Sequence, residues 1–382
     1  MRNLTLLTDL YEITMMQAYF KNNNKNKMAI FDVFYRKNPM DGGYAISAGL
    51  EQVIEYINNL HFTEDDINYL ASLKIFEDDF LDYLKNFKFT GDIYAIPEGS
   101  VMFPREPMLK VIAPIMEAQF IETAILNILN HQSLIATKAA RICYAAEGDG
   151  IMEFGLRRAQ GPDAGIYGAR AAVIGGCAGT SNVLTGQMFD VPVMGTHAHS
   201  WIMSFDDEYT AFYTYAKLYP MACTLLVDTY DTLNSGVPNA IKVFKQIKKE
   251  GIELKNYGIR LDSGDLAYLS KKARKMLDDA GFKDATITAS NDLDEFLIAS
   301  LKMQGAEITN WGVGTNLITS KDCPSFGGVY KLAAIMEDGE NFTPKIKLSD
   351  NSEKITNPGN KKIYRIYEKK NNKIKADLIC LE

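Results

Sequence analysis

The sequence has little that could form disulfide bonds or a cysteine-based metal site. The chain has five cysteines, an odd number, and they are widely separated, with no CxxC motif among them (Cys143, Cys177, Cys223, Cys323 and Cys380). Zinc sites built on cysteine need closely spaced pairs, and disulfide frameworks use an even number of cysteines. We therefore expect reduced thiols in a cytoplasmic protein.

The chain also lacks a long apolar run and an excess of positive charge. Thr8, Asp9 and Glu12 interrupt the apolar positions near the start, so no signal peptide is expected, and no run of about 20 apolar residues suggests a membrane span. The net charge is −7, which disfavours non-specific binding to nucleic acid or anionic membranes. An anionic ligand must then be held by a local cluster of donors.

From about residue 117 a long helical region is followed by apolar strand-like runs that alternate with helical stretches. The runs are GIMEFGLRR, AAVIGGCA, VPVMGTH, CTLLVDTY, YGIRLD, ATITAS and EITNWGVG. Their separations, roughly 20–35 residues, match a βα unit and predict a parallel sheet with right-handed crossovers. Polar residues recur at the ends of the runs, where α/β-barrel enzymes place their chemistry, so a barrel is favoured over an open sheet.

The two ends of the chain share a pattern of short predicted strands and turns. The first hundred residues combine helices with short β-branched strands and turns, and the tail from about residue 325 returns to this pattern, with KKIYRIYEKKNNKIKADLICLE predicting two strands around a turn at Asn371-Asn372. The predicted fold class is α/β. An irregular parallel α/β barrel over 117–325 accompanies a smaller α+β domain over 1–116 that is completed by 326–382.

The segment GTHAHSW contains two of the four histidines, His197 and His199. A histidine pair in this spacing at a barrel strand end could form half of a zinc-hydrolase site, because both imidazoles can point to one face. The other histidines, His61 and His131, lie in the N-terminal region and on the long helix, so further ligands are lacking. If the two histidines are not metal ligands, an exposed imidazole at this turn could be a base, or a nucleophile toward phosphorus.

Two strand-to-helix turns carry groups suited to a phosphate. In WGVGT, Gly312 and Gly314 permit positive φ and close backbone approach, and Thr315 adds a hydroxyl. One βα unit earlier, in ASND, Ser290 and Asn291 stand at the entrance to a helix. A plain tight turn is the alternative for WGVGT. Together the two turns predict a phosphomonoester site, as barrels often have late in the chain.

Arginines at two strand ends are candidates for binding an anion. FGLRRAQGPDAG contains Arg157 and Arg158, of which at most one is expected to face the barrel mouth because neighbours on a strand face opposite ways. A surface ion pair is the alternative for either. Arginine is the side chain that best matches a phosphate or carboxylate in geometry.

GIRLDSGDL places a cation and an anion on the same side of a strand, because Arg260 and Asp262 are two residues apart. Such a pair fits an anionic substrate with a metal ion or hydroxyl groups beside it. Ser263 or Asp265 can instead serve as the N-cap of the following helix.

These segments together resemble the nicotinate phosphoribosyltransferase family along nearly the whole chain. The matching segments are LLTDLYEITM, YAISAGLEQVIEYI, EFGLRRAQGPD, GGCAGTSNV, GTHAHSW, YGIRLDSGDL, SNDLDE, WGVGTNL and KLSDNSEKITNPGNKKIYR. The resemblance implies a type II phosphoribosyltransferase: an irregular α/β barrel beside a mixed domain, generally dimeric with a shared active site. It implies the joining of nicotinate to 5-phosphoribosyl 1-pyrophosphate, coupled to ATP hydrolysis.

The resemblance also implies roles for individual residues. His199 matches the family histidine that ATP phosphorylates, whereas His197 falls on a variable position and is expected to be dispensable polar lining. Thr196 and Arg260 match nicotinate contacts, and Tyr11 matches a tyrosine that stacks on the pyridine ring from the neighbouring subunit.

The phosphoribosyl donor and its Mg²⁺ require further groups. Thr315, with Gly314, matches the family's 5-phosphate loop. We add Arg157, Ser290, Asn291 and Gly312 from the residue patterns above, and Asp262 and Asp265 as candidates near the ribose hydroxyls or magnesium.

Three alternatives stay open at this stage. The first is the related enzyme that uses nicotinamide, although a neutral amide would interact more weakly with an arginine than a carboxylate does. The second is a metal-dependent barrel hydrolase with the HxH pair as ligands. The third is a barrel without catalytic activity that serves as a binding protein.

Overall fold

A computed structural model describes residues 2–22, 24–337, 339–350 and 354–382. The chain forms two compact units: 1–134 with 325–382, and 135–324. We expected the second unit to begin at residue 117; in the structure the division falls inside the long helix α6 (Glu122–Ala145). Residues 351–353, within KLSDNSEKITNPGNKKIYR, lie outside the described residues.

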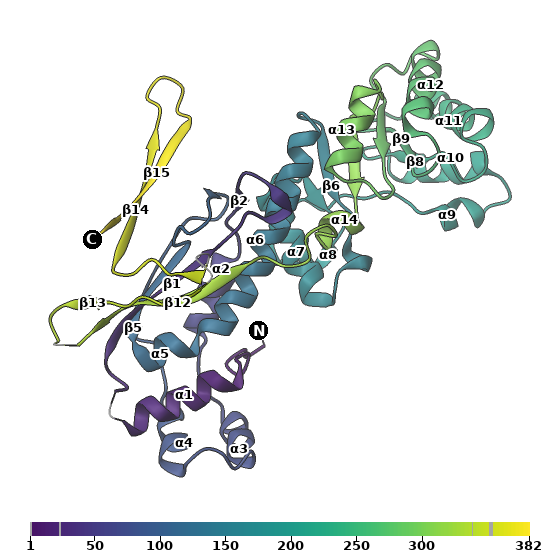
Figure 1. The fold of residues 1–382 in the computed structure, drawn as a ribbon. Helices are drawn as coiled ribbons and strands as arrows, with labels where there is room; N and C mark the ends of the chain where they lie inside the picture. Colours follow the sequence, from purple (N-terminus) through teal and green to yellow (C-terminus); the bar gives the residue numbers. More distant parts are fainter. Residues whose placement is uncertain (1, 23, 338, 351–353) are drawn as a thin grey trace. The chain divides into compact units, whose positions relative to one another are not determined.

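The first unit is built on an antiparallel sheet in the order β13-β12-β1-β5-β3 (Figure 1). Its strands are β1 (Met28–Tyr35), β3 (Asp92–Ala95), β5 (Leu109–Pro114), β12 (Gly328–Met336) and β13 (Phe342–Pro344). Strand β1 is central and its residues are almost all buried. Because β12 pairs with β1 from Ala29 to Tyr35, the tail completes the sheet of the N-terminal segment.

Two smaller ribbons complete the strands of this unit. Strand β2 (Ala45–Ile46) pairs with β4 (Val101–Met102), and β14 (Lys361–Tyr367) pairs with β15 (Ile374–Leu381) in the predicted hairpin. The hairpin forms a sheet of its own, and a buried ion pair of 2.7 Å between Lys361 Nζ and Asp32 Oδ2 links its first residue to β1.

The helices of the first unit pack on this sheet and on one another. They are α1 (Leu10–Lys21), the 3₁₀ turn η1 (Pro39–Asp41), α2 (Leu50–Asn58), α3 (Glu64–Ser72), α4 (Asp78–Leu84), α5 (Ile115–Phe120) and the first part of α6. Helix α5 contacts α1, β1 and β5, and α3 contacts α4 (Figure 1). Helix α3 begins at a capping box in which Thr63 and Asp66 bond each other's backbone.

The second unit contains the predicted parallel sheet, in the order β7-β6-β11-β10-β9-β8. The run AAVIGGCA, expected as a strand, is instead the end of a helix and a turn. The strands are β6 (Gly150–Glu153), β7 (Gly179–Thr180), β8 (Thr224–Leu226), β9 (Gly258–Leu261), β10 (Thr286–Ala289) and β11 (Asn310–Val313). Their residues are mostly buried, as in a parallel sheet covered on both faces. The predicted α/β class and barrel-type fold are confirmed.

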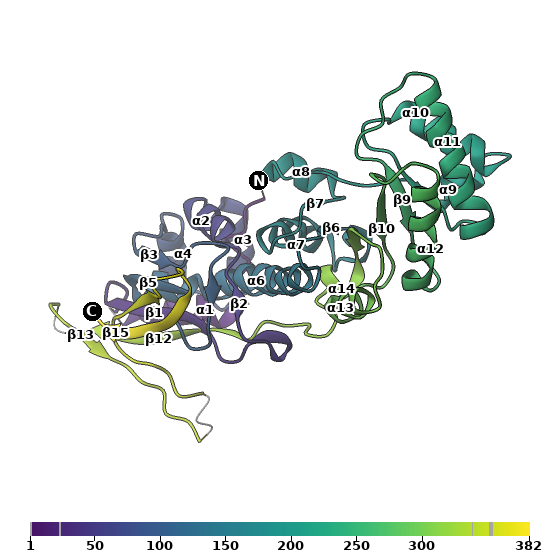
Figure 2. The same cartoon turned by 90° about the horizontal axis from the view of Figure 1, so that it is seen from above.

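Helices connect and cover these strands. They are α7 (Pro162–Ile174), α8 (Val183–Phe189), α9 (His199–Met203), α10 (Glu208–Leu218), α11 (Val237–Lys249), α12 (Leu266–Asp279), α13 (Glu295–Met303) and α14 (Thr315–Ile318), with short turns η2 (Leu156–Arg158) and η3 (Thr232–Gly236). Helix α12 packs against β9 and β10, and α11 packs between α10 and α12 (Figure 2). No helix of the described chain is long and apolar enough to cross a membrane.

Candidate functional site

The parallel sheet brings the carboxyl ends of its strands to one edge, and Arg260 near the end of β9 connects the polar groups there. Its Nη1 donates to the Thr196 hydroxyl and, at 3.4 Å, to the carbonyl oxygen of His197, while Nη2 lies 3.4 Å from Asp262 Oδ1. Burial lowers the pKa of Arg260, and the Asp262 and Asp228 carboxylates oppose that effect. An arginine remains protonated under such conditions, so this edge holds a largely buried cation.

His199 is the first residue of α9 and contacts a different group through each ring nitrogen. Nδ1 lies 3.0 Å from Thr229 Oγ1, and Nε2 lies 3.8 Å from Asp262 Oδ2. The side chain is 39% exposed, so a ligand can reach it. The structure thus brings together four of the residues predicted from the sequence: Thr196, His199, Arg260 and Asp262. Thr229 was missed, because it is distant in sequence from His199.

His197 is buried, with 8% of its surface exposed, and is not the polar lining that we expected. Its Nε2 accepts a hydrogen bond from the Leu226 backbone N–H at 3.4 Å, and Nδ1 lies 3.5 Å from the Ala198 carbonyl oxygen. The ring packs edge-on against Tyr215, 4.7 Å between centroids. With both nitrogens engaged by backbone, His197 is unsuited to binding a metal ion, which removes half of the HxH zinc-site alternative.

Asp228, near the end of the run CTLLVDTY, also belongs to the site. Its Oδ2 accepts 2.7 Å hydrogen bonds from the Asp262 N–H and from the Ser263 hydroxyl. Its Oδ1 is buried and has no hydrogen-bond partner among the residues that the structure describes. A buried carboxylate oxygen without a partner is costly unless a ligand satisfies it.

Ser290 joins the same cluster from the end of β10. Its hydroxyl donates to Asp262 Oδ1, and its N–H donates to the Leu261 carbonyl oxygen at 2.9 Å. The next residue, Asn291, has φ of +117°, a conformation that residues with a side chain rarely adopt. Strained backbone of this kind is concentrated at binding and active sites.

The two predicted phosphate turns are neighbours in space. Asn316, in the first turn of α14, donates its side-chain amide to the carbonyl oxygens of Asp292 at 3.1 Å and Leu293 at 3.0 Å, in the turn after Ser290. Strands β10 and β11, which precede the turns, pair directly. The turns that carry Ser290, Asn291 and Thr315 therefore lie next to each other.

The glycines of WGVGT do not use the positive φ that glycine permits. Gly314 has φ of −110°, and Gly312 also lies outside the positive-φ region. A Cβ on Gly312 would lie 2.6 Å from the ring of Phe154, so this glycine makes room for an aromatic side chain. Gly314 precedes α14, whose first residue is Thr315.

Arg157 and Arg158 lie in the 3₁₀ turn η2 and not on a strand, because β6 ends at Glu153. The expected alternation of the two arginines across a strand is therefore wrong. Both side chains are exposed. Arg157 is close enough to lower the pKa of Arg260 by charge repulsion, so of the two it is the one associated with the site.

Glu153, at the end of β6, is a buried carboxylate that the sequence analysis did not single out. It accepts hydrogen bonds from the Thr180 hydroxyl, at 2.6 Å, and from the Gly155 N–H. Burial raises the pKa of Glu153, and these hydrogen bonds oppose the effect. Its position at a strand end was the only signal, and the sequence could not show that Thr180 would meet it.

Tyr11 and Asp265 have local partners that the structure defines. Tyr11 lies in the first unit, on α1, and is 44% exposed; burial of its hydroxyl and the nearby Glu122 raise its pKa. Asp265 is the N-cap of α12 and accepts the Tyr268 N–H at 3.0 Å, which was the alternative left open for it. In the described parts of the chain, no three His, Cys, Asp or Glu side chains form a metal-binding group.

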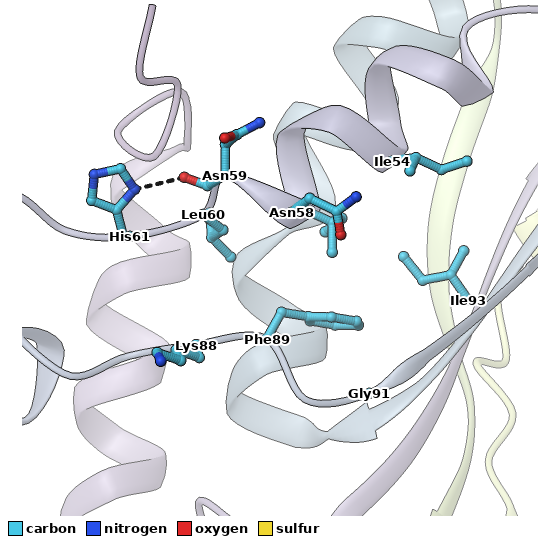
Figure 3. A pocket seen from close by; sticks show the side chains of 10 residues that line it. Ile54, Asn58, Asn59, Leu60, His61, Lys88, Phe89, Gly91 and Ile93 are labelled. Atoms are coloured by element: carbon cyan, nitrogen blue, oxygen red, sulfur yellow. Dashed lines mark hydrogen bonds between the residues drawn. The ribbon is translucent and has the colours of Figure 1, made fainter.

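A pocket of about 640 Å³ in the first unit contains none of the predicted site residues (Figure 3). It is lined by Ile54, Ile57, Asn58, Asn59, Leu60, His61, Lys88, Phe89, Gly91 and Ile93. Its one imidazole, that of His61, is tied to the Asn59 carbonyl oxygen at 2.7 Å. The pocket therefore offers no cluster of reactive groups comparable to that at the strand ends of the second unit.

The burial of His197 makes stability depend on pH. Burial, with smaller effects from Arg260 and His199, lowers its pKa from 6.5 to about 4. Between these values the unfolded chain binds a proton that the folded chain does not, so stability is full above pH 6.5 and is lost as pH falls toward 4. We expect the wild type to lose up to about 3 kcal/mol more unfolding free energy over this range than His197→Phe, measured by urea unfolding. Parallel pH profiles of the two proteins would contradict this.

A parallel α/β barrel with a buried arginine, two aspartates and an accessible histidine at its strand ends is typical of barrel enzymes that act on anionic substrates. Residues 6–130 match the nicotinate phosphoribosyltransferase N-terminal domain, and residues 150–375 match the nicotinate phosphoribosyltransferase family. The chain belongs to the nicotinate phosphoribosyltransferase family.

Individual relatives agree with this assignment. A nicotinate phosphoribosyltransferase of Bacillus subtilis is 53% identical over 379 residues, which are 99% of this chain and 76% of that protein. The human nicotinate phosphoribosyltransferase is 33% identical over 418 residues, covering 94% of this chain and 76% of that one. The crystal structure of human nicotinic acid phosphoribosyltransferase superposes with a TM-score of 0.84 at 31% identity, covering 98% of this chain and 81% of the human one.

Proposed function

We propose that this protein transfers the phosphoribosyl group of 5-phosphoribosyl 1-pyrophosphate to nicotinate, forming nicotinate mononucleotide and pyrophosphate for NAD salvage, coupled to ATP through a phosphohistidine. The observation that carries the proposal is the buried Arg260 cation, bonded to Thr196 and set beside His199 and Asp262. Membership of the family supports the same reaction.

Nicotinate is a flat anion, and the site has groups that match both properties. Arg260 presents a planar cation to a carboxylate, and its Nε–H is buried without a hydrogen-bond partner among the described residues. Thr196 accepts from Arg260 and donates its hydroxyl to the His197 carbonyl oxygen at 3.3 Å, and it can turn that hydroxyl to the same carboxylate. Tyr11 offers the aromatic face; we propose that it comes from the second copy of a homodimer with shared active sites, because α1 exposes it.

The phosphoribosyl donor requires several groups that neutralise its phosphates. Thr315, with Gly312 and Gly314 in the preceding backbone, is proposed to hold the 5-phosphate together with Ser290 and Asn291 from the neighbouring turn. The adjacency of the two turns supports one shared site.

Arg157 is proposed to bind the pyrophosphate group from the exposed turn η2, where its guanidinium is accessible. Its repulsion from Arg260 would be relieved by an anion bound between them. The net charge of −7 makes such local cations necessary for a highly charged donor.

In the proposed reaction the ring nitrogen of nicotinate forms a bond to the anomeric carbon of the ribose. The carbon–oxygen bond to pyrophosphate breaks, and its electron pair leaves with the pyrophosphate. Positive charge develops on the sugar, so positioning and charge neutralisation carry the catalysis and no protein nucleophile at carbon is needed. Asp262 is proposed to lie near the ribose, held by Ser290 and Arg260.

The carboxylates fit a bound Mg²⁺. Asp262 and Asp228, whose Oδ1 has no partner among the described residues, offer the oxygen ligands that this ion prefers. Asp265 is held as a helix cap and has less freedom to bind it. Magnesium usually takes one or two carboxylates and completes its shell with water and substrate phosphates, so three protein ligands are not required. When bound, Mg²⁺ would neutralise charge on the departing pyrophosphate.

His199 is proposed to accept the γ-phosphoryl group of ATP on a ring nitrogen, with ADP leaving, and to release phosphate on later hydrolysis. Its exposure permits the approach of ATP, and Thr229 and Asp262 orient its ring. We further propose that the protein works in the cytoplasm, where its free thiols stay reduced.

One assay tests the proposed reaction. Protein, the phosphoribosyl donor and Mg²⁺ are mixed with equal amounts of nicotinate and nicotinamide, with and without ATP, and both mononucleotides are quantified by chromatography. We expect nicotinate mononucleotide as the main product, formed faster with ATP, because Arg260 favours a carboxylate over a neutral amide. Faster turnover of nicotinamide would assign the protein to that base instead. Formation of neither product would refute the proposed reaction.

A further inference from the structure

In the part of the chain that the structure describes, the parallel sheet of the second unit has no main-chain ladder between its two outermost strands. At one edge, segment 192–194 pairs with β7: the Thr180 N–H donates to Pro192 at 3.0 Å, and the Met194 N–H donates to Thr180 at 2.9 Å. At the other edge is β8. In the barrel, residues 195–199 must therefore run from the first edge to the second.

His197 makes the connection to β8 with its side chain. The Val227 N–H donates to the Arg260 carbonyl oxygen of β9 at 3.1 Å. Because successive N–H groups of a strand point to opposite sides, the Leu226 N–H faces the open edge. His197 Nε2 accepts that N–H at 3.4 Å. The imidazole thus replaces one bond of the missing ladder.

The residue type is suited to this task. Leu226 and the His197 ring are buried, so the Leu226 N–H would be unsatisfied without an acceptor. Nδ1 faces the Ala198 carbonyl oxygen at 3.5 Å, which favours the neutral tautomer with its proton on Nδ1 and a lone pair on Nε2. Packing against Tyr215 of α10 holds the ring in this orientation.

The contact between His197 and Leu226 lies next to residues of the proposed nicotinate and phosphohistidine sites. Thr196 precedes His197, and His199 follows it by two residues. The His197 carbonyl oxygen also accepts a hydrogen bond from Arg260 Nη1 at 3.4 Å. Any slip of this segment along β8 would move Thr196 and His199 relative to Arg260 and Asp262.

We infer that His197 is a positioning residue, which closes the barrel onto β8 and so holds Thr196 and His199 in register with Arg260. This inference rests on the proposed function and reverses the expectation that His197 is dispensable. His197 itself touches neither nicotinate nor the phosphoryl group.

Two substitutions separate the hydrogen bond from the packing. His197→Phe keeps a buried ring but has no acceptor, whereas His197→Gln supplies an acceptor oxygen. We expect His197→Phe to raise the KM for nicotinate by about tenfold and to raise the ATP hydrolysed per product, while His197→Gln recovers most of both. A residue that only supported the fold would lower the amount of active enzyme and leave KM and the coupling ratio unchanged.

Hydrogen exchange gives a readout that does not depend on activity. In full-length folded protein, peptides that include Leu226 and residues 195–203 should exchange faster in His197→Phe than in the wild type or His197→Gln. Unchanged exchange, KM and coupling in folded His197→Phe would overturn the inference. If the wild type makes no nicotinate mononucleotide, the proposed function fails, and the exchange measurement still decides whether His197 joins the two edges.

Discussion

The His199→Ala variant is expected to form nicotinate mononucleotide at the same slow rate with and without ATP. If His199 carries the phosphoryl group, its removal abolishes the step through which ATP acts, while the base and donor sites stay in place. We expect ATP-supported turnover to fall by about 10²-fold, equal to about 2.7 kcal/mol of transition-state stabilisation. Product formation and ADP release, measured together in the same samples, test this.

A matched control is available in the first unit. His61 is an exposed histidine whose ring bonds only the nearby Asn59 carbonyl in the described contacts, so His61→Ala should keep both the ATP stimulation and the labelled phosphoenzyme formed from γ-labelled ATP. In His199→Ala the label should be absent. If His199→Ala still couples ATP hydrolysis to product, the phosphohistidine belongs elsewhere or does not exist.

The second large effect is expected for Arg260→Lys. A lysine keeps the charge but cannot contact Thr196, the His197 carbonyl and Asp262 together, because it lacks the planar guanidinium with its several donors. Loss of a buried, hydrogen-bonded charge contact costs roughly 2–5 kcal/mol. We therefore expect kcat/KM for nicotinate to fall by about 10²-fold or more, chiefly through a higher KM.

The same variant tests which part of the base Arg260 recognises. With the carboxylate contact weakened, activity on nicotinamide should change much less than activity on nicotinate. The ratio of nicotinate activity to nicotinamide activity should therefore fall. Arg274→Lys is the control: Arg274 also pairs with a carboxylate, that of Asp278, but on α12, and its variant should keep the wild-type preference. An unchanged preference in Arg260→Lys would show that Arg260 does not bind the carboxylate.

Much of the architecture followed from patterns local to the sequence. Apolar runs separated by helical stretches predicted the parallel sheet, because a βα unit has a characteristic length and crosses over in one direction. The tail was predicted to return to the first unit because, from about residue 325, short strands and turns replace the alternating strands and helices. Arg260 and Asp262 were paired correctly, although Asp262 directly follows β9 and is not on the strand itself.

The residues that were missed or misplaced depend on partners distant in the chain. The periodicity of a helix or strand predicts the face on which a side chain lies, but not the residue that it contacts in the tertiary structure. Thr229 meets His199, Asp228 holds Asp262, and Leu226 turns its N–H toward His197 only because the strands lie in one order. Gly312 is required by the ring of Phe154, which directly follows the neighbouring strand β6, and not by a positive φ.

By itself, the sequence determined the fold class, the family and the group of residues at the strand ends. Within the sequence, only the family resemblance separated the two histidines of GTHAHSW, and it left His197 without a role. The tertiary structure decided their environments: His197 is buried against β8, while His199 begins a helix with its ring accessible. Strand order determines the burial and the hydrogen-bond partners of each histidine. These in turn make His197 a positioning residue and leave His199 free to react.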